Sequence, residues 1–329
     1  MRSYFLLSAL ALCLCSATAT AQVEVRVASL APKGSAWANI MAKGAADIET
    51  KTAGRVKVRF FFSGQQGDEK DYVRKMKLGQ LDGAALTAVG LGQIKPEVRV
   101  LDLPFLFKSD KQLDYVRNKM SADFEGHFDS AGYVLLAWGD VGWTHIYSNI
   151  PLTSKADLAN TKIWAWTDDP IVKDLFGKLG INGIPLGVPD VLPSLSTGKI
   201  DACYGSPLAA VALQWYTKVK HATEVPLSYA VGAFVVRKDV FNKLSADDQK
   251  IVRESGKIIG ANLIAVVRKD NERAKNAMKK SGITFDASPP AFLTELEGKA
   301  KETWSSLTGK LYSAETLAKV KKLVAEAPR

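Results

Sequence analysis

Strand-like and helix-like segments alternate along most of this chain, and that alternation limits the folds it can adopt. Residues 23–30 (VEVRVASL) and 55–62 (RVKVRFFF) alternate apolar and polar side chains, which predicts a strand in each place. Between them, after a turn that ends in the N-cap candidate Ser35, apolar residues recur with helical spacing from Trp37 to Ile48. A strand–helix–strand unit predicts a parallel pair joined by a right-handed crossover.

The alternation continues to about residue 238. A polar loop followed by a helix is expected within residues 64–81. Another helix is expected to start at Asp168 or Asp169, with Pro170 in its first turn. Residues 101–107 (LDLPFLF) contain a proline, which favours a fixed loop or an edge over a central strand. Further strands are predicted at 82–90, 132–140, 142–149, 162–166, 198–205 and 227–238.

The last third of the chain has a different pattern. A capping pattern from Ser245 to Asp248 opens a helical segment that extends to about Lys280, and further helices are expected near 290–306 and 313–326. Strands that alternate with helices, followed by a helical tail, predict an α/β class with parallel sheets.

The first 21 residues have the features of a secretory signal. Arg2 precedes a short apolar run, and small residues lead to Ala21, which predicts cleavage before Gln22. The run is too short for a good membrane span, so we expect an exported, periplasmic, monomeric protein. After cleavage Cys203 is the one remaining cysteine, which excludes a disulfide within one chain, and its apolar context predicts a buried structural thiol.

Charge and motif content argue against nucleic-acid binding and catalysis. The formal net charge is +10, or +9 (43 basic minus 34 acidic residues) without Arg2, but Lys and Arg are interleaved with acids. The histidines at 127, 145 and 221 lack ligand-spaced partners, and no P-loop, G-x-S-x-G or H-E-x-x-H motif is present. We therefore expect no enzyme activity, no metal, no cofactor and no nucleic-acid partner, which leaves a binding protein as the main class.

In this order the segments resemble the DctP-type substrate-binding proteins of TRAP (tripartite ATP-independent periplasmic) transporters. The resemblance covers essentially the whole mature chain. It rests on the order and spacing of APKGSAW, KTAGRVKVRFFFSGQQGDEKDYVRKMKLGQLDGA, VLDLPFLF, PLTSKADLANTKIWAW, LGINGIPLGVPDVLPSLSTGKIDACYGSP and LSADDQ.

The resemblance implies a two-lobed periplasmic binding protein fold, type II-like, with a long helix and strands that span the hinge. A ligand between the lobes would close them, and the closed form would dock on the small and large membrane subunits of the transporter. The implied division is a signal peptide at 1–21, lobe I at 22–145 and about 225–265, lobe II at about 146–224 and 266–310, and a C-terminal helix at 311–329.

Position 164 departs from the family pattern. Relatives typically carry an arginine on this strand, as in K-I-R, which pairs with a substrate carboxylate, and a second position that is commonly basic is Thr144 here. Trp164 offers one N–H donor and a large apolar face in place of a guanidinium. This change favours an aromatic or partly apolar ligand. The alternative is that Trp164 and Trp166 fill the packed interior of a lobe.

The ligand-binding candidates combine tryptophans with polar residues at loops and strand ends. A polar loop with Gln66 and Asp68 is expected to cover the ligand or to form a solvated turn, and Thr87 is expected to face the cleft or to cap a helix. The full set is Trp37, Gln66, Asp68, Thr87, Trp138, Thr144, Trp164, Trp166, Tyr204 and Ser206.

Three functions remain open from the sequence. The first is a transport receptor for a small organic solute that is neutral or weakly acidic. The second is a receptor that still binds a carboxylate, through Lys162, Arg74 or backbone N–H groups at a helix start. The third is a ligand sensor that uses the same fold to feed a signalling partner.

Overall fold

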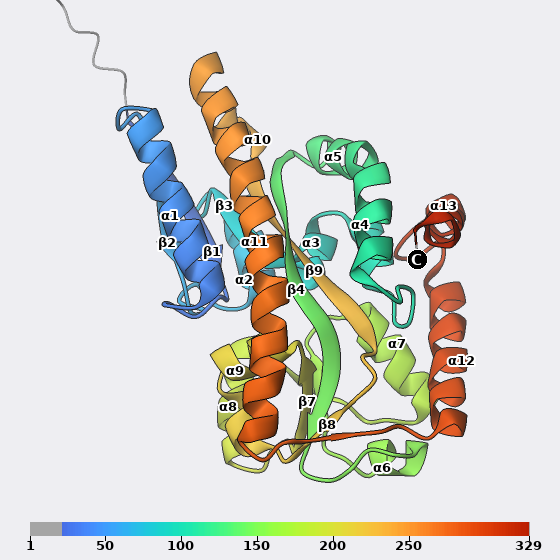
Figure 1. The fold of residues 1–329 in the computed structure, drawn as a ribbon. Helices are drawn as coiled ribbons and strands as arrows, with labels where there is room; N and C mark the ends of the chain where they lie inside the picture. The colour runs from blue at the N-terminus through green and yellow to red at the C-terminus, as the bar shows by residue number, and fades with distance from the viewer. Residues whose placement is uncertain (1–21, 329) are drawn as a thin grey trace, which may run out of the picture.

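The strands form two groups that share one long strand (Figure 1). The computed structural model describes residues 22–328, so the expected signal peptide at 1–21 lies outside the described residues. In chain order the strands are β1 (Val23–Ser29), β2 (Val56–Phe61), β3 (Gly83–Thr87), β4 (Tyr133–Ser148), β5 (Trp164–Trp166), β6 (Ile184–Leu186), β7 (Ala202–Gly205), β8 (His221–Thr223), β9 (Ser228–Arg237) and β10 (Thr284–Asp286).

The helices surround these strands and include one that runs the length of the molecule (Figure 1). They are α1 (Ala36–Lys51), α2 (Glu69–Lys77), α3 (Ala88–Ile94), the 3-10 helix η1 (Pro96–Asp102), α4 (Asp110–Lys119), α5 (Ser121–Ser130), α6 (Lys155–Ala159), α7 (Pro170–Leu179), α8 (Val188–Ser196), α9 (Pro207–Ala212), the 3-10 helix η2 (Trp215–Lys218), α10 (Lys238–Phe241), α11 (Ala246–Lys280), α12 (Pro290–Leu307) and α13 (Ala314–Glu326).

The sheet is mixed, so the expectation of parallel sheets is wrong in part. Its order is β10-β8-β4-β9-β3-β1-β2, with β7 also paired to β4, while β5 and β6 form a separate parallel pair. β9 runs antiparallel to both β3 and β4. The reason is that β4 leads from the half of the molecule around β1–β3 to the half around β7, β8 and β10, and β9 brings the chain back.

The first strand–helix–strand unit forms as predicted. β1 and β2 pair in parallel, with Val23 opposite Val56. Oγ of Ser35 caps α1 by accepting a hydrogen bond from the backbone N–H of Ala38. The apolar face of α1, which includes Met41 and Ile48, is buried, as its helical spacing indicates.

β4 is one strand of 16 residues, so the prediction of two strands at 132–140 and 142–149 is wrong. Its pairing with β9 shifts register between Asp140 and Gly142. Gly142 has a φ of +120°, and a Cβ atom there would lie 2.4 Å from Nδ2 of Asn271 in α11. The glycine therefore produces a bulge within a continuous strand, where the sequence indicated a break.

α11 is a single helix of 35 residues that packs against both halves. Oγ of Ser245 accepts a hydrogen bond from the backbone N–H of Asp248, which confirms the predicted N-terminus. The helix contacts α1 and β4 in the first half and α9 in the second. At Gly256 and Gly260, a Cβ atom would fall 2.7 and 2.6 Å from backbone oxygens of β4, so small residues allow this close packing.

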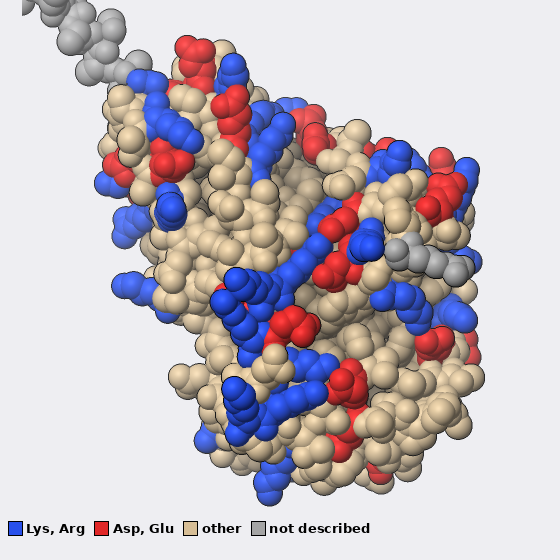
Figure 2. All heavy atoms as spheres, viewed as in Figure 1, with Lys and Arg blue, Asp and Glu red and all other residues tan. Residues whose placement is uncertain are grey.

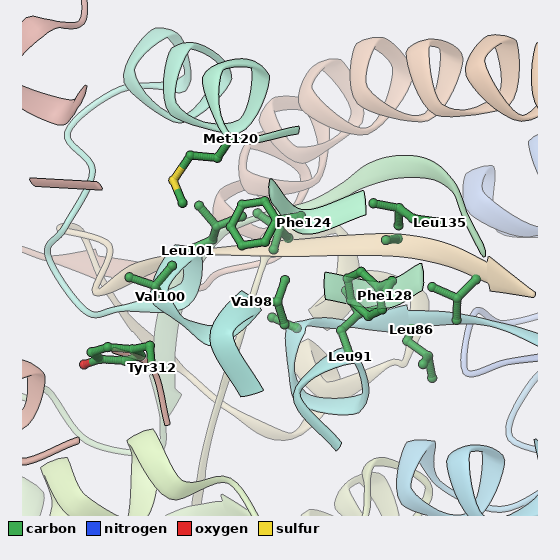
Figure 3. Close-up of a cluster of buried hydrophobic side chains, with 14 of the residues drawn as sticks. Leu86, Leu91, Val98, Val100, Leu101, Met120, Phe124, Phe128, Leu135 and Tyr312 are labelled. Carbon is green, nitrogen blue, oxygen red and sulfur yellow. The ribbon is translucent and has the colours of Figure 1, made fainter. Parts of the chain in front are cut away.

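A buried apolar cluster fixes the segment that carries η1 (Figure 3). Val98, Val100 and Leu101 of η1 point into this cluster and pack with Phe124 and Phe128 of α5. Because these side chains anchor η1 on one side, the residue between Val98 and Val100 is held in a fixed position. That residue is an arginine.

The outer surface carries basic and acidic side chains interleaved over the face shown in Figure 2. Within residues 22–328, none of the helices combines the length and the apolar character needed to cross a membrane. Cys203 in β7 is a free, fully buried thiol, as the sequence predicts.

Candidate ligand-binding site

A cavity of about 240 Å³ lies between the two halves. β1, β3, β4 and β9 line it from the first half, β5, α7 and α9 line it from the second, and α11 contributes Ile259 and Leu263. Most of the lining residues are apolar. Eight are aromatic: Trp37, Trp138, Trp164, Trp166, Phe176, Tyr204, Trp215 and Phe234.

The structure brings most of the predicted site residues to this cavity. Gln66 and Asp68 do not line it. Contact with a ligand stays a prediction for each of them. The predicted residues that line the cavity are Trp37, Thr87, Trp138, Thr144, Trp164, Trp166, Tyr204 and Ser206.

Trp164 belongs both to the cavity wall and to a buried aromatic cluster. It is only 1% exposed. Its ring stacks on Tyr204 with centroids 4.6 Å apart and meets Trp215 edge-on at 5.4 Å. Nε1 donates a 3.0 Å hydrogen bond to the backbone oxygen of Leu186, so the one donor of the indole is already used. Trp164 therefore offers a ligand only apolar contact. The sequence left two interpretations open, a residue of the cleft and a residue of the packed interior, and this side chain has features of both.

Trp166 links the two halves beside the cavity. Its Nε1 donates a 2.8 Å hydrogen bond to Oδ2 of Asp68, which is the buried N-cap of α2. Burial raises the pKa of Asp68 above its usual value. Gln66 instead accepts hydrogen bonds from Nζ of Lys75 through both its backbone oxygen and Oε1. The polar loop thus reaches the second half through Asp68, while Gln66 bonds within its own half.

Thr87 caps a helix and also holds a buried carboxyl group. Its Oγ1 accepts from the backbone N–H of Val89 and donates a 2.8 Å hydrogen bond to Oε2 of Glu69. The Glu69 carboxyl group also accepts from the backbone N–H groups of Thr87 and Gly90. Desolvation by burial raises the pKa of Glu69 to about 7. The Thr87 hydroxyl is therefore engaged within the protein.

Other polar candidates have partners within the protein too. Oγ of Ser206 caps α9, and the hydroxyl oxygen of Tyr204 accepts a 3.0 Å hydrogen bond from the backbone N–H of Trp166. Nε1 of Trp37 donates to the backbone oxygen of Asp140 at 3.1 Å. These contacts orient the side chains and leave mainly their apolar surfaces for a ligand.

Two tryptophans of β4 differ in their exposure to the cavity. Trp138 lines it, lies within β4, and has an Nε1 that is buried without a partner in the described residues. Trp143 does not line the cavity, and its Nε1 donates to Oδ1 of Asp110. Thr144 lines the cavity, and its backbone oxygen accepts a hydrogen bond from the N–H of Leu227.

Arg99 is the cavity residue that sequence analysis missed. It lies in η1, and its side chain is 2% exposed. Nη2 donates to both carboxylate oxygens of Asp169, at 3.0 and 3.1 Å, and to Oδ2 of Asp102 at 3.1 Å. The available signal was a single arginine within the apolar run from Val98 to Leu101, because arginine is seldom fully buried unless it is paired.

The charged residues at the cavity are mainly acidic. Among its lining residues in the described chain, Arg99 is the only basic side chain, and Glu69, Asp102, Asp140 and Asp169 also line it. Desolvation raises the pKa of Asp102 to about 6, although the Arg99 guanidinium opposes that rise. An incoming carboxylate would therefore meet one paired guanidinium and several carboxyl groups.

Asp140 has its own counterions, which do not line the cavity. It accepts hydrogen bonds from Arg117 Nη1 at 2.6 Å, Arg268 Nε at 2.7 Å and the hydroxyl of Tyr229 at 2.7 Å. These partners come from α4, α11 and β9, so the network ties three elements to the bulge in β4. The carboxylate of Asp140 is therefore paired with arginines of the protein itself.

The cations proposed from sequence for carboxylate binding lie elsewhere. Nζ of Lys162 donates to the backbone oxygen of Gly198 in an exposed position, and Arg74 pairs with Asp71 on the surface. Neither lines the cavity. Among residues 22–328 there is also no group of three or more His, Cys, Asp or Glu side chains that could hold a metal ion.

Comparisons with known proteins agree with this architecture. Residues 27–310 match the family described as bacterial extracellular solute-binding protein, family 7, DctP. The 2,3-diketo-L-gulonate-binding periplasmic protein YiaO of Escherichia coli (strain K12) is 25% identical over 259 residues, which cover 77% of this chain and 75% of that relative. The C4-dicarboxylate-binding periplasmic protein DctP of Rhodobacter capsulatus is 26% identical over 301 residues, 86% of this chain and 87% of the relative.

A solved structure shows the same fold. The sugar acid binding protein DctPAm from Advenella mimigardefordensis strain DPN7T, in complex with galactonate, superposes with a TM-score of 0.87 at 20% identity, over 94% of this chain and 99% of that one. The fold, with a cavity between its two halves, is that of a two-lobed solute receptor. The chain belongs to family 7 of the bacterial extracellular solute-binding proteins, the DctP-type receptors of TRAP transporters. The family, the fold class and the prediction of a binding protein that is not an enzyme are confirmed.

Proposed function

We propose that this protein captures a small organic solute with an apolar or aromatic body in the cavity between its lobes. The observation that carries the proposal is the cavity wall, which includes Trp164 with its single donor bonded to Leu186. The family resemblance implies an arginine at this position in relatives. Stacking and apolar contact are the interactions that such a wall supplies.

A receptor for an organic acid is the second candidate. Two observations favour it: Arg99 lies at the cavity, and relatives are named for acids, including C4-dicarboxylates and galactonate. The acidic neighbours Asp102 and Asp169 weigh against a dicarboxylate, because two ligand charges would be desolvated beside a guanidinium that is already paired.

A thermal-shift screen of the mature protein over matched neutral and acidic solutes tests the proposal. A neutral or weakly acidic aromatic solute at 100 times its dissociation constant should add about 2.7 kcal/mol to the free energy of unfolding. Stabilisation by C4-dicarboxylates alone would contradict the proposed ligand class and support the second candidate. Calorimetric titration would then give the affinity of each hit.

The division into lobes and the delivery step complete the proposal. Lobe I comprises 22–145 and about 225–265, and lobe II comprises about 146–224 and 266–310. In the periplasm, a monomer would close on its solute and present the closed form to the membrane subunits of a TRAP transporter. Transporter subunits encoded beside this gene would support delivery over a sensor role, and a smaller radius of gyration on ligand binding would support closure.

A further inference from the structure

Among the described residues, the one basic side chain that lines the cavity, Arg99, is already paired with carboxylates of the protein itself. Nη2 of Arg99 makes hydrogen bonds to both oxygens of Asp169 and to one oxygen of Asp102, and within residues 22–328 these are its hydrogen bonds. The side chains of Arg99 and Asp169 are 2% and 4% exposed. Solvent therefore screens this pair little.

The pair joins two elements that are far apart in the chain. Arg99 lies in η1, which the buried cluster of Figure 3 holds in place, and Asp169 is the N-cap of α7 in the other half. Oδ1 of Asp169 also accepts hydrogen bonds from the backbone N–H groups of Ile171 and Val172. Its negative charge is thus fixed by the helix N-terminus as well as by the guanidinium.

We propose that Asp169 serves as an internal counter-carboxylate that pairs with Arg99 at the cavity wall, so that the site accepts an uncharged solute with a hydrogen-bond acceptor oxygen. In this arrangement the carboxylate that bonds Arg99 is that of Asp169, from the other half of the protein. The ligand does not have to supply a carboxylate. This inference rests on the proposed function and specifies the ligand class of the same cavity.

A second feature of Arg99 points to the acceptor on the ligand. Within residues 22–328, Nε of Arg99 is buried without a hydrogen-bond partner, and the hydrogen bonds of Arg99 all use Nη2, which leaves Nη1 as a further donor of the guanidinium. A donor left unpaired in the interior is rare and costly, and a carbonyl or hydroxyl oxygen would satisfy a guanidinium donor without adding a charge. A second full negative charge would instead be placed beside Asp102 and Asp169, which disfavours it.

The test compares the wild-type protein with Asp169→Asn, using benzamide against benzoate and hexanamide against hexanoate as probes. Asparagine is a good N-cap, so α7 keeps its cap while Arg99 loses a charged partner. In the wild type each amide should bind more tightly than its acid. In Asp169→Asn the carboxylate should gain about tenfold or more relative to its amide, because a charged hydrogen bond to Arg99 becomes available.

Asp190→Asn is the matched control, because Asp190 is an exposed acid in the first turn of α8 that does not line the cavity. It should leave the acid-to-amide ratio unchanged. Melting curves check the fold, and if Asp169→Asn does not fold, Asp102→Asn takes its place because it removes the other carboxylate partner of Arg99.

An unchanged acid-to-amide ratio in the folded variant would overturn the inference, as would tighter binding of the acids by the wild type. Failure of every probe to bind either protein would also overturn it, because Arg99 should attract an anion once the charge of Asp169 is removed. The proposed function has a separate criterion, since the wild type can bind an aromatic solute in the screen even when Asp169→Asn leaves the ratio unchanged.

Discussion

Replacing Trp164 by alanine should weaken both the fold and the site, by amounts that the structure allows us to estimate. The change removes a buried ring from between Tyr204 and Trp215 and leaves the backbone oxygen of Leu186 without its partner. Truncation of a buried tryptophan costs about 3–5 kcal/mol. For a chain of this size, that corresponds to a fall of roughly 10 °C in melting temperature of the unliganded protein.

The affinity for a cavity ligand should fall as well, by roughly 2 kcal/mol, as expected when an aromatic anchor is truncated. Thermal unfolding without ligand and calorimetric titration with it measure the two effects separately. Trp164→Phe should cost less stability than Trp164→Ala, because it keeps an aromatic ring against Tyr204. It still loses the hydrogen bond to Leu186.

Trp304→Ala is the matched control for this prediction. Trp304 donates a hydrogen bond to the backbone oxygen of Pro104 and does not line the cavity, so its loss should reduce stability and leave affinity unchanged. A melting temperature within about 2 °C of wild type for Trp164→Ala would refute the packing argument. Unchanged affinity would refute the assignment of Trp164 to the binding wall.

Three further predictions concern the junction of the halves and the buried titrating groups. Asp68→Ser should keep the cap of α2 but lose the bond to Trp166, so ligand affinity measured by titration should fall while the melting temperature changes little. Gly142→Ala should destabilise the protein by about 2 kcal/mol or more in urea unfolding, because its φ is +120° and Asn271 occupies the Cβ position. Burial lowers the pKa of His145 to about 4, so the contribution of His145 to the free energy of unfolding should fall by roughly 3 kcal/mol as pH drops from 7 to 4, and His145→Asn should remove that part of the pH dependence.

The sign of the His145 effect follows from proton binding. Its pKa in the folded protein lies below the value of about 6.5 in an unfolded chain, so between these pH values the unfolded chain binds more protons and stability rises with pH. Glu69 acts in the opposite direction, because its raised pKa of about 7 makes its contribution fall as pH rises from about 4.5 to 7. The comparison with His145→Asn isolates the histidine.

Local signals predicted the elements whose causes are local. The β1–α1–β2 unit, the cap of α7 at Asp169 and the start of α11 after Ser245 all depend on residues within a few positions of one another. β4 was divided wrongly because Gly142 looks like a turn in isolation. Its pairing with β9, some ninety residues further along, keeps the strand continuous.

The difference between local and long-range signals also explains which site residues could be predicted from the sequence. Aromatic residues such as Trp164 and Trp166 are visible by type and by strand periodicity, and they line the cavity as the spacing implied. Arg99 gave only a weak signal, because its meaning depends on Asp169, which is 70 residues away in the chain. A long-range pair of this kind forms only when the chain folds, so no residue spacing in the sequence indicates it.

The continuity of β4 also has a consequence for how the molecule folds. A strand that pairs with β9 from Tyr133 to Thr144, and with β7 and β8 between His145 and Ser148, completes the sheets of both lobes at once. Neither lobe can finish its sheet without residues that the other also holds, and α11 adds a second shared element. The two lobes are therefore poor candidates for independent folding units, and unfolding of one should propagate to the other as a single cooperative event. To exchange one lobe for that of a relative, the pairing of β4 would have to be replaced in both sheets at the same time.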